Sequence, residues 1–182
     1  MATLGIAAGP SARAEVSENV VTTKGGVDEF NYVVWEPATK AKFRFTLLDW
    51  TDEERTSCID LGLVDSSSAA SSENTYDWPC RCLQYRSQQD TSYVQEFLAD
   101  IPHDDDSDDG VPVCHPLGVR MSVGDYVDFQ LDDVTGEVAV AVNGNVVTSF
   151  HSEVKGIAWH PFVCVKGSAK VSVKYAEDDS TG

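Results

Sequence analysis

The feature that most constrains the fold is the stretch of residues 121–150, in which three short extended runs are separated by tight turns. In the first run Val127, Phe129 and Leu131 alternate with polar residues, which is the pattern of a strand with one buried side. Asn143-Gly144 joins the second run to the third, and both residues tolerate the left-handed backbone region that a two-residue hairpin requires. The stretch therefore predicts an antiparallel β-meander with a buried face on every strand.

Similar runs along the rest of the chain point to one fold class. The alternating residues 30–35 and 43–47 and the apolar run 58–64 recur at spacings of about 8–12 residues, separated by Gly, Pro, Asn and Asp turns. Residues 92–98 fit either a single helical turn, with Ser92 as its cap, or an irregular strand. With almost no other helical pattern and no internal repeat, the sequence predicts an all-β fold, a two-sheet antiparallel β-sandwich.

The chain of 182 residues is expected to form one sandwich domain over residues 25–176. Residues 1–24 are rich in Ala, Gly, Ser and Thr and have weak periodicity, so we expect a flexible N-terminal tail. A cleaved signal peptide is the alternative, because Ala12-Arg13-Ala14 resembles a cleavage site. No Lys or Arg precedes its apolar part, however, so we favour the tail. Residues 177–182 are expected to form a short acidic C-terminal tail.

The motifs of the second half, taken in order, resemble those of the SPRY (B30.2-like) domain family. Gly124-Asp125 opens the alternating run, Asn143-Gly144 closes a strand–hairpin unit, Trp159-His160-Pro161-Phe162-Val163 gives an aromatic–proline–hydrophobic strand, and residues 170–175 alternate once more. The resemblance extends over residues 42–175. It implies a SPRY- and concanavalin-like jelly roll in which Trp159 packs between the sheets. It also implies a non-catalytic module whose loop rim binds a peptide or protein within a scaffold, signalling or ubiquitin-ligase-type assembly.

Charge limits the classes of partner. The chain carries 30 acidic and 13 basic residues, a net charge of -17. Such a field repels phosphate backbones and anionic lipid surfaces, so we expect neither a nucleic-acid nor a membrane partner. No apolar run is long enough to span a bilayer. A protein or peptide partner with a basic segment is favoured instead, because opposite charges speed encounter.

The cysteines point to a reducing compartment. Their number is odd, and a domain of this length does not need disulfides, so we expect free thiols in an intracellular, cytoplasmic protein. Cys80-x-Cys82 and Cys114-His115 could supply four zinc ligands, but their spacing does not fit a structural zinc site. We therefore expect no metal and no cofactor. The five cysteines are Cys58, Cys80, Cys82, Cys114 and Cys164.

Neither calcium binding nor catalysis is well supported by the polar residues. Residues 105–110 match the first half of an EF-hand loop, but Pro116 stands where a bidentate Glu is required. We interpret the acidic run from Asp104 to Asp109 as a solvated loop, with an opportunistic Ca²⁺ site as the alternative. A nucleophile elbow, a phosphate loop and an HExxH motif are all missing from the sequence. We therefore expect a protein that is not an enzyme.

Aromatic and cationic residues beside loop signals are the candidates for partner contact. Trp, Tyr and Arg side chains dominate the binding energy of protein interfaces, and loops carry most binding sites. The resemblance places Lys166 in the turn between the last two strands, whereas Tyr76-Asp77-Trp78 departs from the tryptophan motif that the family often has in this region. The predicted partner-binding residues are Trp50, Trp78, Arg81, Tyr85, Arg86 and Lys166.

Two rival functions belong to other classes. A lectin-like sandwich would bind glycan, with the acidic loop holding Ca²⁺, and sugar or Ca²⁺ would raise its melting temperature. A purely structural subunit would show a large apolar patch and form an oligomer in solution. The sequence favours an interaction module over both.

Overall fold

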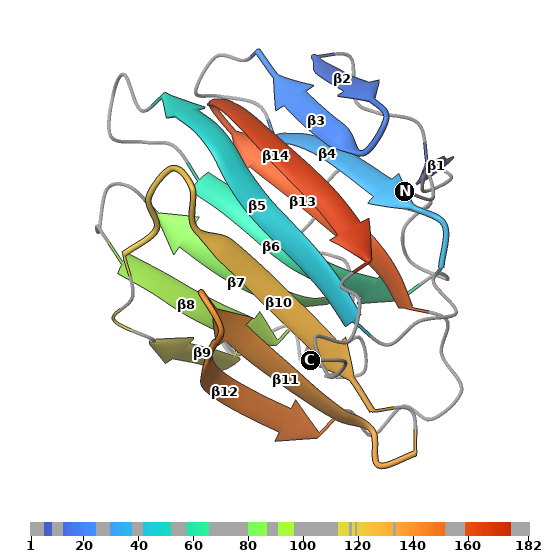
Figure 1. The fold of residues 1–182 in the computed structure, drawn as a ribbon, viewed down its shortest axis with the longest axis vertical. Coiled ribbons are helices and arrows are strands. Elements are labelled where there is room, and N and C mark those ends of the chain that lie inside the picture. Colours follow the sequence, from blue (N-terminus) through green and yellow to red (C-terminus); the bar gives the residue numbers. More distant parts are fainter. Residues whose placement is uncertain are drawn as a thin grey trace, which may run out of the picture.

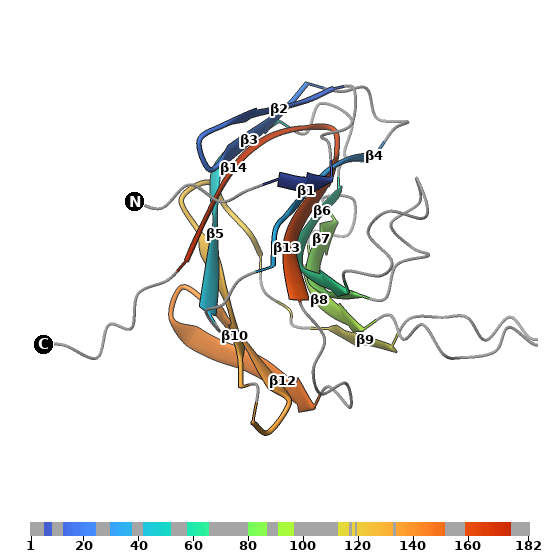
Figure 2. The same ribbon diagram turned by 90° about the vertical axis from the view of Figure 1, so that its right-hand side faces the viewer.

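The computed structural model describes residues 6–8, 13–24, 30–37, 42–51, 58–65, 80–86, 91–96, 113–116, 118, 120–132, 134–151 and 159–175. These residues form two seven-stranded sheets that lie face to face as two layers (Figure 1 and Figure 2). Every pair of neighbouring strands is antiparallel. The predicted all-β, two-sheet antiparallel sandwich is confirmed.

Strands of the two sheets are interleaved in the sequence. The strands of sheet A are β1 (Ile6–Ala8), β4 (Phe30–Trp35), β6 (Cys58–Asp65), β7 (Cys80–Arg86), β8 (Thr91–Glu96), β9 (Val113–Pro116) and β13 (Trp159–Lys166). The strands of sheet B are β2 (Ala14–Ser17), β3 (Val20–Thr23), β5 (Lys42–Thr51), β10 (Tyr126–Leu131), β11 (Glu137–Val142), β12 (Asn145–His151) and β14 (Ser168–Tyr175). Sheet A has the order β1-β4-β13-β6-β7-β8-β9, and sheet B the order β12-β11-β10-β5-β14-β3-β2. The chain therefore crosses between the layers several times.

The core lies between the sheets and is built from the inward side of each alternating strand. Phe45 of β5 meets Phe129 of β10 edge to face, with ring centroids 5.8 Å apart, and both side chains are fully buried. Trp159 of β13 is also buried in this cluster, as the family resemblance implied. Aromatic groups of this size dominate the energetics of a core.

Strand β13 of sheet A carries apolar side chains on both faces. Val163 of β13 points into the core, whereas Phe162 and Cys164 belong to a second buried cluster on the opposite face. Cys58 and Cys164 are buried thiols that form no disulfide, and the Cys58 thiol donates to Asp60 Oδ1 at 3.5 Å. The nearly continuous apolar sequence of β13 therefore reflects burial on both faces.

The predicted meander is confirmed as strands β10, β11 and β12. Val127 pairs with Val142 and Phe129 with Val140, and β11 pairs in turn with β12. Every second residue of β11 is buried, so its alternating sequence has one inward face. The turn between β11 and β12 has positive φ at both positions, 50° at Asn143 and 81° at Gly144, as the Asn-Gly signal requires.

The N-terminal region differs from the expected flexible tail. β2 and β3 pair with each other, and β3 pairs with β14 of sheet B. Ala14 and Val21 are buried in the core. The turn between the two strands has Glu18 at φ 55°, so no glycine marks the hairpin in the sequence. Residues 177–182, expected to be an acidic tail, lie outside the described residues.

The ambiguous stretch at residues 92–98 is a strand where the structure describes it. Residues 91–96 form β8, which pairs with β7 on one side and β9 on the other. Its ladder of backbone hydrogen bonds outweighs the local capping signal that Ser92 offered for a helix.

Candidate functional site

One end of the sandwich contains two changes of layer, and we call it the crossover end. β5 ends in sheet B at Thr51, and β6 begins in sheet A at Cys58. Gly167, with φ 110°, alone links Lys166 of β13 to Ser168 of β14. Because Ser168 pairs with Thr51 and Lys166 pairs with Cys58, the two crossings lie side by side.

The crossover end brings together the backbones of four predicted contact residues. Trp50 lies next to the last residue of β5. Lys166 and Arg86 lie in one row of sheet A, because both pair with Cys58, and Tyr85 directly precedes Arg86. These residues come from both layers, and only the crossings bring them near one another.

The other two predicted residues are not placed at this end. Arg81 pairs with Leu63 and Glu96, toward the opposite end of β7 from Arg86. Five residues of extended chain separate the two arginines by about 16 Å. Arg81 therefore does not share a compact site with Lys166. Trp78 lies outside the described residues, and β7 is described by its backbone alone.

Trp50 and Lys166 are both held by their surroundings. Trp50 is half-buried against the edge of the core, and its backbone N–H donates to Asp49 Oδ1 at 2.8 Å. The ammonium of Lys166 lies 5.9 Å from the centroid of the Phe30 ring, within the range of a cation–π interaction. Each side chain thus keeps a defined position and some accessible surface.

Two exposed aliphatic side chains at the crossover end were not among the predicted site residues. Leu48 is 41% exposed and Val123 is 58% exposed. The backbone brings them near each other, because Gly124 N donates to Leu47 O at 2.8 Å and Leu47 N donates to Asp125 O at 3.0 Å. The sequence signal was the Leu47-Leu48 pair. The alternation of β5 that buries Leu47 leaves Leu48 at an outward position, where a polar residue is expected.

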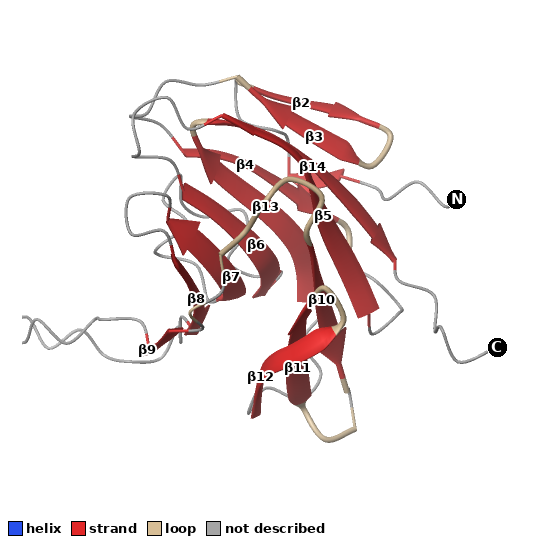
Figure 3. Ribbon diagram, turned by 60° about the vertical axis from the view of Figure 1, so that its left-hand side comes forward, coloured by secondary structure: helices blue, strands red, loops and turns tan. Residues whose placement is uncertain are grey.

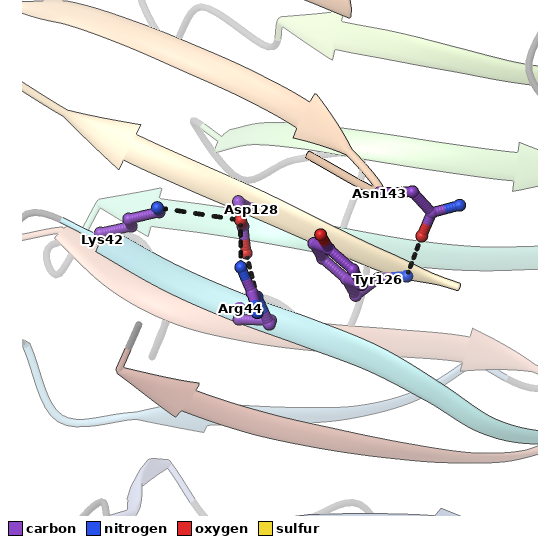
Figure 4. Close-up of polar contacts among 5 residues, drawn as sticks. All are labelled: Lys42, Arg44, Tyr126, Asp128 and Asn143. Atoms are coloured by element: carbon purple, nitrogen blue, oxygen red, sulfur yellow. Dashed lines mark hydrogen bonds and ion pairs between the residues drawn. The ribbon is translucent and has the colours of Figure 1, made fainter. Parts of the chain in front are cut away.

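A network of hydrogen bonds fixes the loop that carries Val123. The carboxylate of Asp125 accepts from Ser122 N at 2.7 Å and from Asn143 Nδ2 at 2.8 Å. The side-chain oxygen of Asn143 accepts in turn from Tyr126 N at 3.0 Å, as Figure 4 shows. The loop and the β11–β12 turn are therefore held as one unit.

The outer face of sheet B carries a buried ion pair beside this unit. Arg44 binds Asp128 in a bidentate manner, with Nε to Oδ1 at 2.7 Å and Nη2 to Oδ2 at 2.8 Å (Figure 4). Lys42 Nζ lies 3.9 Å from the same carboxylate, and the Arg44 guanidinium stacks 4.1 Å from the centroid of Tyr126. Because the charges compensate one another at a site that is largely closed to solvent, we assign the group a structural role.

Metal-binding candidates are few in the part of the chain that the structure describes. No group of three or more His, Cys, Asp or Glu side chains there is placed to hold a metal ion. The register of sheet A puts Cys82 and Cys114 in one row, but Gln95 of β8 lies between them. The acidic loop at residues 104–109 lies outside the described residues. In the described ranges there is also no helix long and apolar enough to cross a membrane.

Comparison with known proteins gives a match in fold and none in sequence. No family model and no curated protein matches the chain. A human SPRY domain matches with a TM-score of 0.65 at 16% identity, over 93% of this chain and 99% of that chain. A legume lectin-like domain from Entamoeba histolytica matches with a TM-score of 0.67 at 10% identity, over 93% of this chain and 89% of that chain. An alginate lyase from Pseudomonas aeruginosa matches with a TM-score of 0.56 at 12% identity, over 91% of this chain and 87% of that chain.

These matches confirm the fold that the SPRY resemblance implied. The matching structures include a SPRY domain, a lectin-like domain and an enzyme, so one architecture carries several kinds of function. The function of this chain must therefore be argued from its own surface.

Proposed function

We propose that the chain is a non-catalytic protein-interaction module of the SPRY type, which binds a peptide or protein partner at the crossover end. The observation that carries the proposal is the presence there of Leu48 and Val123, exposed by 41% and 58%, beside half-buried Trp50. A tryptophan is a typical anchor of a binding hot spot, and the contacts around it contribute mainly by excluding water. The SPRY resemblance of the sequence supports the same class of function.

Lys166 and Arg86 extend the proposed surface toward sheet A. The row that contains them lies across the layer change from Trp50. Cationic residues in this row suit a partner with hydrogen-bond acceptors beside its apolar anchor. Tyr85 is left out of the surface, because it lies in the row of Ile59 and Val165, which belong to the core. Arg81 is left out of this surface because it lies toward the other end of β7.

A basic segment in the partner is supported by charge. The net charge of the chain is -17, and exposed Asp49 adjoins Leu48 and Trp50 at the crossover end. Long-range attraction would raise the association rate of a cationic partner, and salt would reduce it. The SPRY resemblance of the sequence supports an intracellular scaffold, signalling or ubiquitin-ligase-type assembly as the setting of this partner.

The test begins with affinity capture of partners from cell extract, followed by binding measurements with the recovered partner. Trp50→Ala and a Leu48→Ala/Val123→Ala double variant should each weaken binding by about 2 kcal/mol or more. The association rate should fall as salt is raised. Val134→Ala is the matched control, because Val134 is 77% exposed in a turn at the opposite end of β10.

The control separates a local surface from a general loss of folding. Melting temperatures of Val134→Ala and of the double variant should remain close to that of the parent. Trp50→Ala removes a ring that packs against the core and should lower the melting temperature, so its binding is measured well below that temperature. If Val134→Ala weakens binding as much as Trp50→Ala, or if neither crossover-end variant has an effect, the proposed surface is wrong.

A lectin-like function is the second candidate, because a legume lectin-like domain shares the fold with a TM-score of 0.67. It is tested by the melting temperature in the presence of a panel of monosaccharides, with and without Ca²⁺. A stabilisation that requires sugar would favour this function over protein binding.

A further inference from the structure

The four edge strands of the two sheets differ in length and in chemistry. β1 has three residues, and β9 has four and ends in Pro116. β2 has four residues and carries Glu15. Short strands, charges and proline are the devices that prevent an edge from pairing with another chain. Three of the four edges are therefore protected.

β12 is the exception. It has seven residues, Asn145–His151, with the sequence Asn-Val-Val-Thr-Ser-Phe-His, and it contains neither proline nor a carboxylate, lysine or arginine. β-Branched and aromatic residues make up most of it, and these favour an extended conformation. An edge of this kind is a template for the addition of another strand.

The outer side of β12 is accessible in the part of the chain that the structure describes. β11 is its neighbour on one side, and no described strand pairs with the other side, so β12 forms the border of sheet B (Figure 3). Val146 is 69% exposed, and Ser149 is exposed as well. Pairing with β11 is continuous from Thr148 to His151, so this part of the edge is regular.

We propose that β12 pairs with β12 of a second copy of this chain, which joins two seven-stranded sheets across a two-fold axis. A two-fold axis places identical strands antiparallel, which is the arrangement of every pair in the sandwich. The chain has a net charge of -17, so most contacts between two copies would set like charges together. β12 avoids this in any register, because it contributes no carboxylate and no cationic group.

The alternative occupant of this edge is an extended basic peptide. β12 itself offers no carboxylate to receive a cationic side chain, so charge favours the second copy at this edge. The inference does not depend on the binding function proposed for the crossover end.

Sedimentation equilibrium of the full chain from low to high micromolar concentration tests the proposal. We expect a reversible monomer–dimer equilibrium that shifts toward the dimer at high salt, because salt screens the repulsion between two acidic chains. This salt dependence is opposite in sign to that expected for a basic partner at the crossover end. A monomer at every concentration and salt level would overturn the proposal.

Ser149→Lys identifies the surface. Because of the two-fold axis, one substitution places two new charges at the interface, and dimerisation should weaken by about tenfold. Ser17→Lys is the control, since it makes the same substitution at an exposed residue of β2, which forms the opposite edge of sheet B. A dimer that is equally affected, or equally unaffected, by both substitutions does not use this edge and overturns the proposal.

Amide hydrogen exchange provides a readout of strand pairing. Residues 145–151 should exchange more slowly as protein concentration rises, and this protection should be lost in Ser149→Lys. A synthetic peptide of alternating lysine and valine probes the other occupant. Protection of β12 by this peptide, without protection by concentration, would overturn self-pairing in favour of peptide binding.

Discussion

The two outer parts of sheet B, the β10–β12 meander and the β2–β3 hairpin, differ in how the sequence encodes them. In the meander, alternation and turn chemistry are both local, because Asn143-Gly144 supplies the two positive φ angles of 50° and 81° between β11 and β12. In the β2–β3 hairpin, Glu18 adopts φ 55° in the turn, although a glycine would do so at lower cost. The meander could be recognised without knowledge of its neighbours, whereas the hairpin could not.

Contacts with distant residues hold the β2–β3 hairpin in place. The hydroxyl of Thr23 donates to Gly167 O at 3.2 Å and accepts from Ala169 N at 3.0 Å. Val173 N donates to Asn19 O at 2.8 Å in the turn itself. The partners of this hairpin therefore lie in β14 and the link before it, near the other end of the chain. A four-residue strand with weak alternation can be stable when a neighbouring strand supplies its order.

The largest expected effect tests whether the local turn determines the meander. Gly144→Val should reduce the free energy of unfolding by about 1–3 kcal/mol, because a β-branched residue resists positive φ. A Cβ at this position would also lie 3.3 Å from the hydroxyl oxygen of Tyr126. Chemical denaturation measures the loss, and Asn145→Val at the next, exposed position is the control. Equal stability of the two variants would show that the local turn does not determine the meander.

The next effect concerns the distant contacts of the hairpin. Thr23→Val preserves shape but removes the hydroxyl, and it leaves the N–H of Ala169 and the carbonyl of Gly167 without that partner. The free energy of unfolding should fall by about 1–2 kcal/mol. Thr22→Val, on the opposite side of β3, should have a much smaller effect, since Thr22 is not buried. If both variants match the parent in denaturant unfolding, tertiary contacts at Thr23 are not what holds the hairpin.

A substitution in the β2–β3 turn is expected to increase the stability of the protein. Glu18→Gly gives the β2–β3 turn the residue that its φ of 55° favours, and we expect up to about 1 kcal/mol of stabilisation. The measurement is again the unfolding free energy, with Glu15→Gly in β2 as a control that should destabilise. A loss of stability in Glu18→Gly would mean that the side chain, and not the backbone, governs this turn.

The smallest effect is a pH dependence at the other turn of the meander. The N–H groups of Thr135 and Val134 donate to the carboxylate of Asp132, and they lower its pKa from the ordinary 3.8. Because the folded pKa lies below the unfolded one, the contribution is complete above the unfolded pKa and is lost as the pH falls through the folded pKa.

Asp132→Ala isolates that contribution. The stability difference between parent and variant should be measurable near neutral pH, and it should shrink in acid below the unfolded pKa. The group is exposed, so the difference is small at any pH. Denaturant midpoints measured across the acidic range check the sign, and a difference that grows toward low pH would contradict it.

Much of the fold could be inferred from the sequence wherever the pattern and its partner are close together. The meander, the inward Trp159 and the two-sheet architecture followed from alternation, turn residues and the SPRY resemblance. Residues 92–98 stayed ambiguous, because a single polar cap fits a helix and a strand equally well until the neighbouring strands are known. The β2–β3 hairpin was not predicted from the sequence, because its strands are stabilised by pairing with β14, which is distant in the chain.

The candidate site could be predicted only in part for a similar reason. Trp50 and Lys166 were chosen for residue type, and two changes of layer place them at one end. Arg81 and Arg86 lie close in sequence, but the extended strand places them toward opposite ends of β7. Leu48 and Val123 become neighbours through backbone hydrogen bonds between segments far apart in the chain, and residue type alone does not signal this.

The one-residue link between the sheets has a mechanical consequence. Gly167 leaves no slack between β13 and β14, and its carbonyl is anchored by the Thr23 hydroxyl. The layers cannot separate at the crossover end without breaking strand pairs, so this end of the sandwich resists deformation. A partner that docks here meets a surface that keeps its shape, and little of the binding free energy is lost in ordering it.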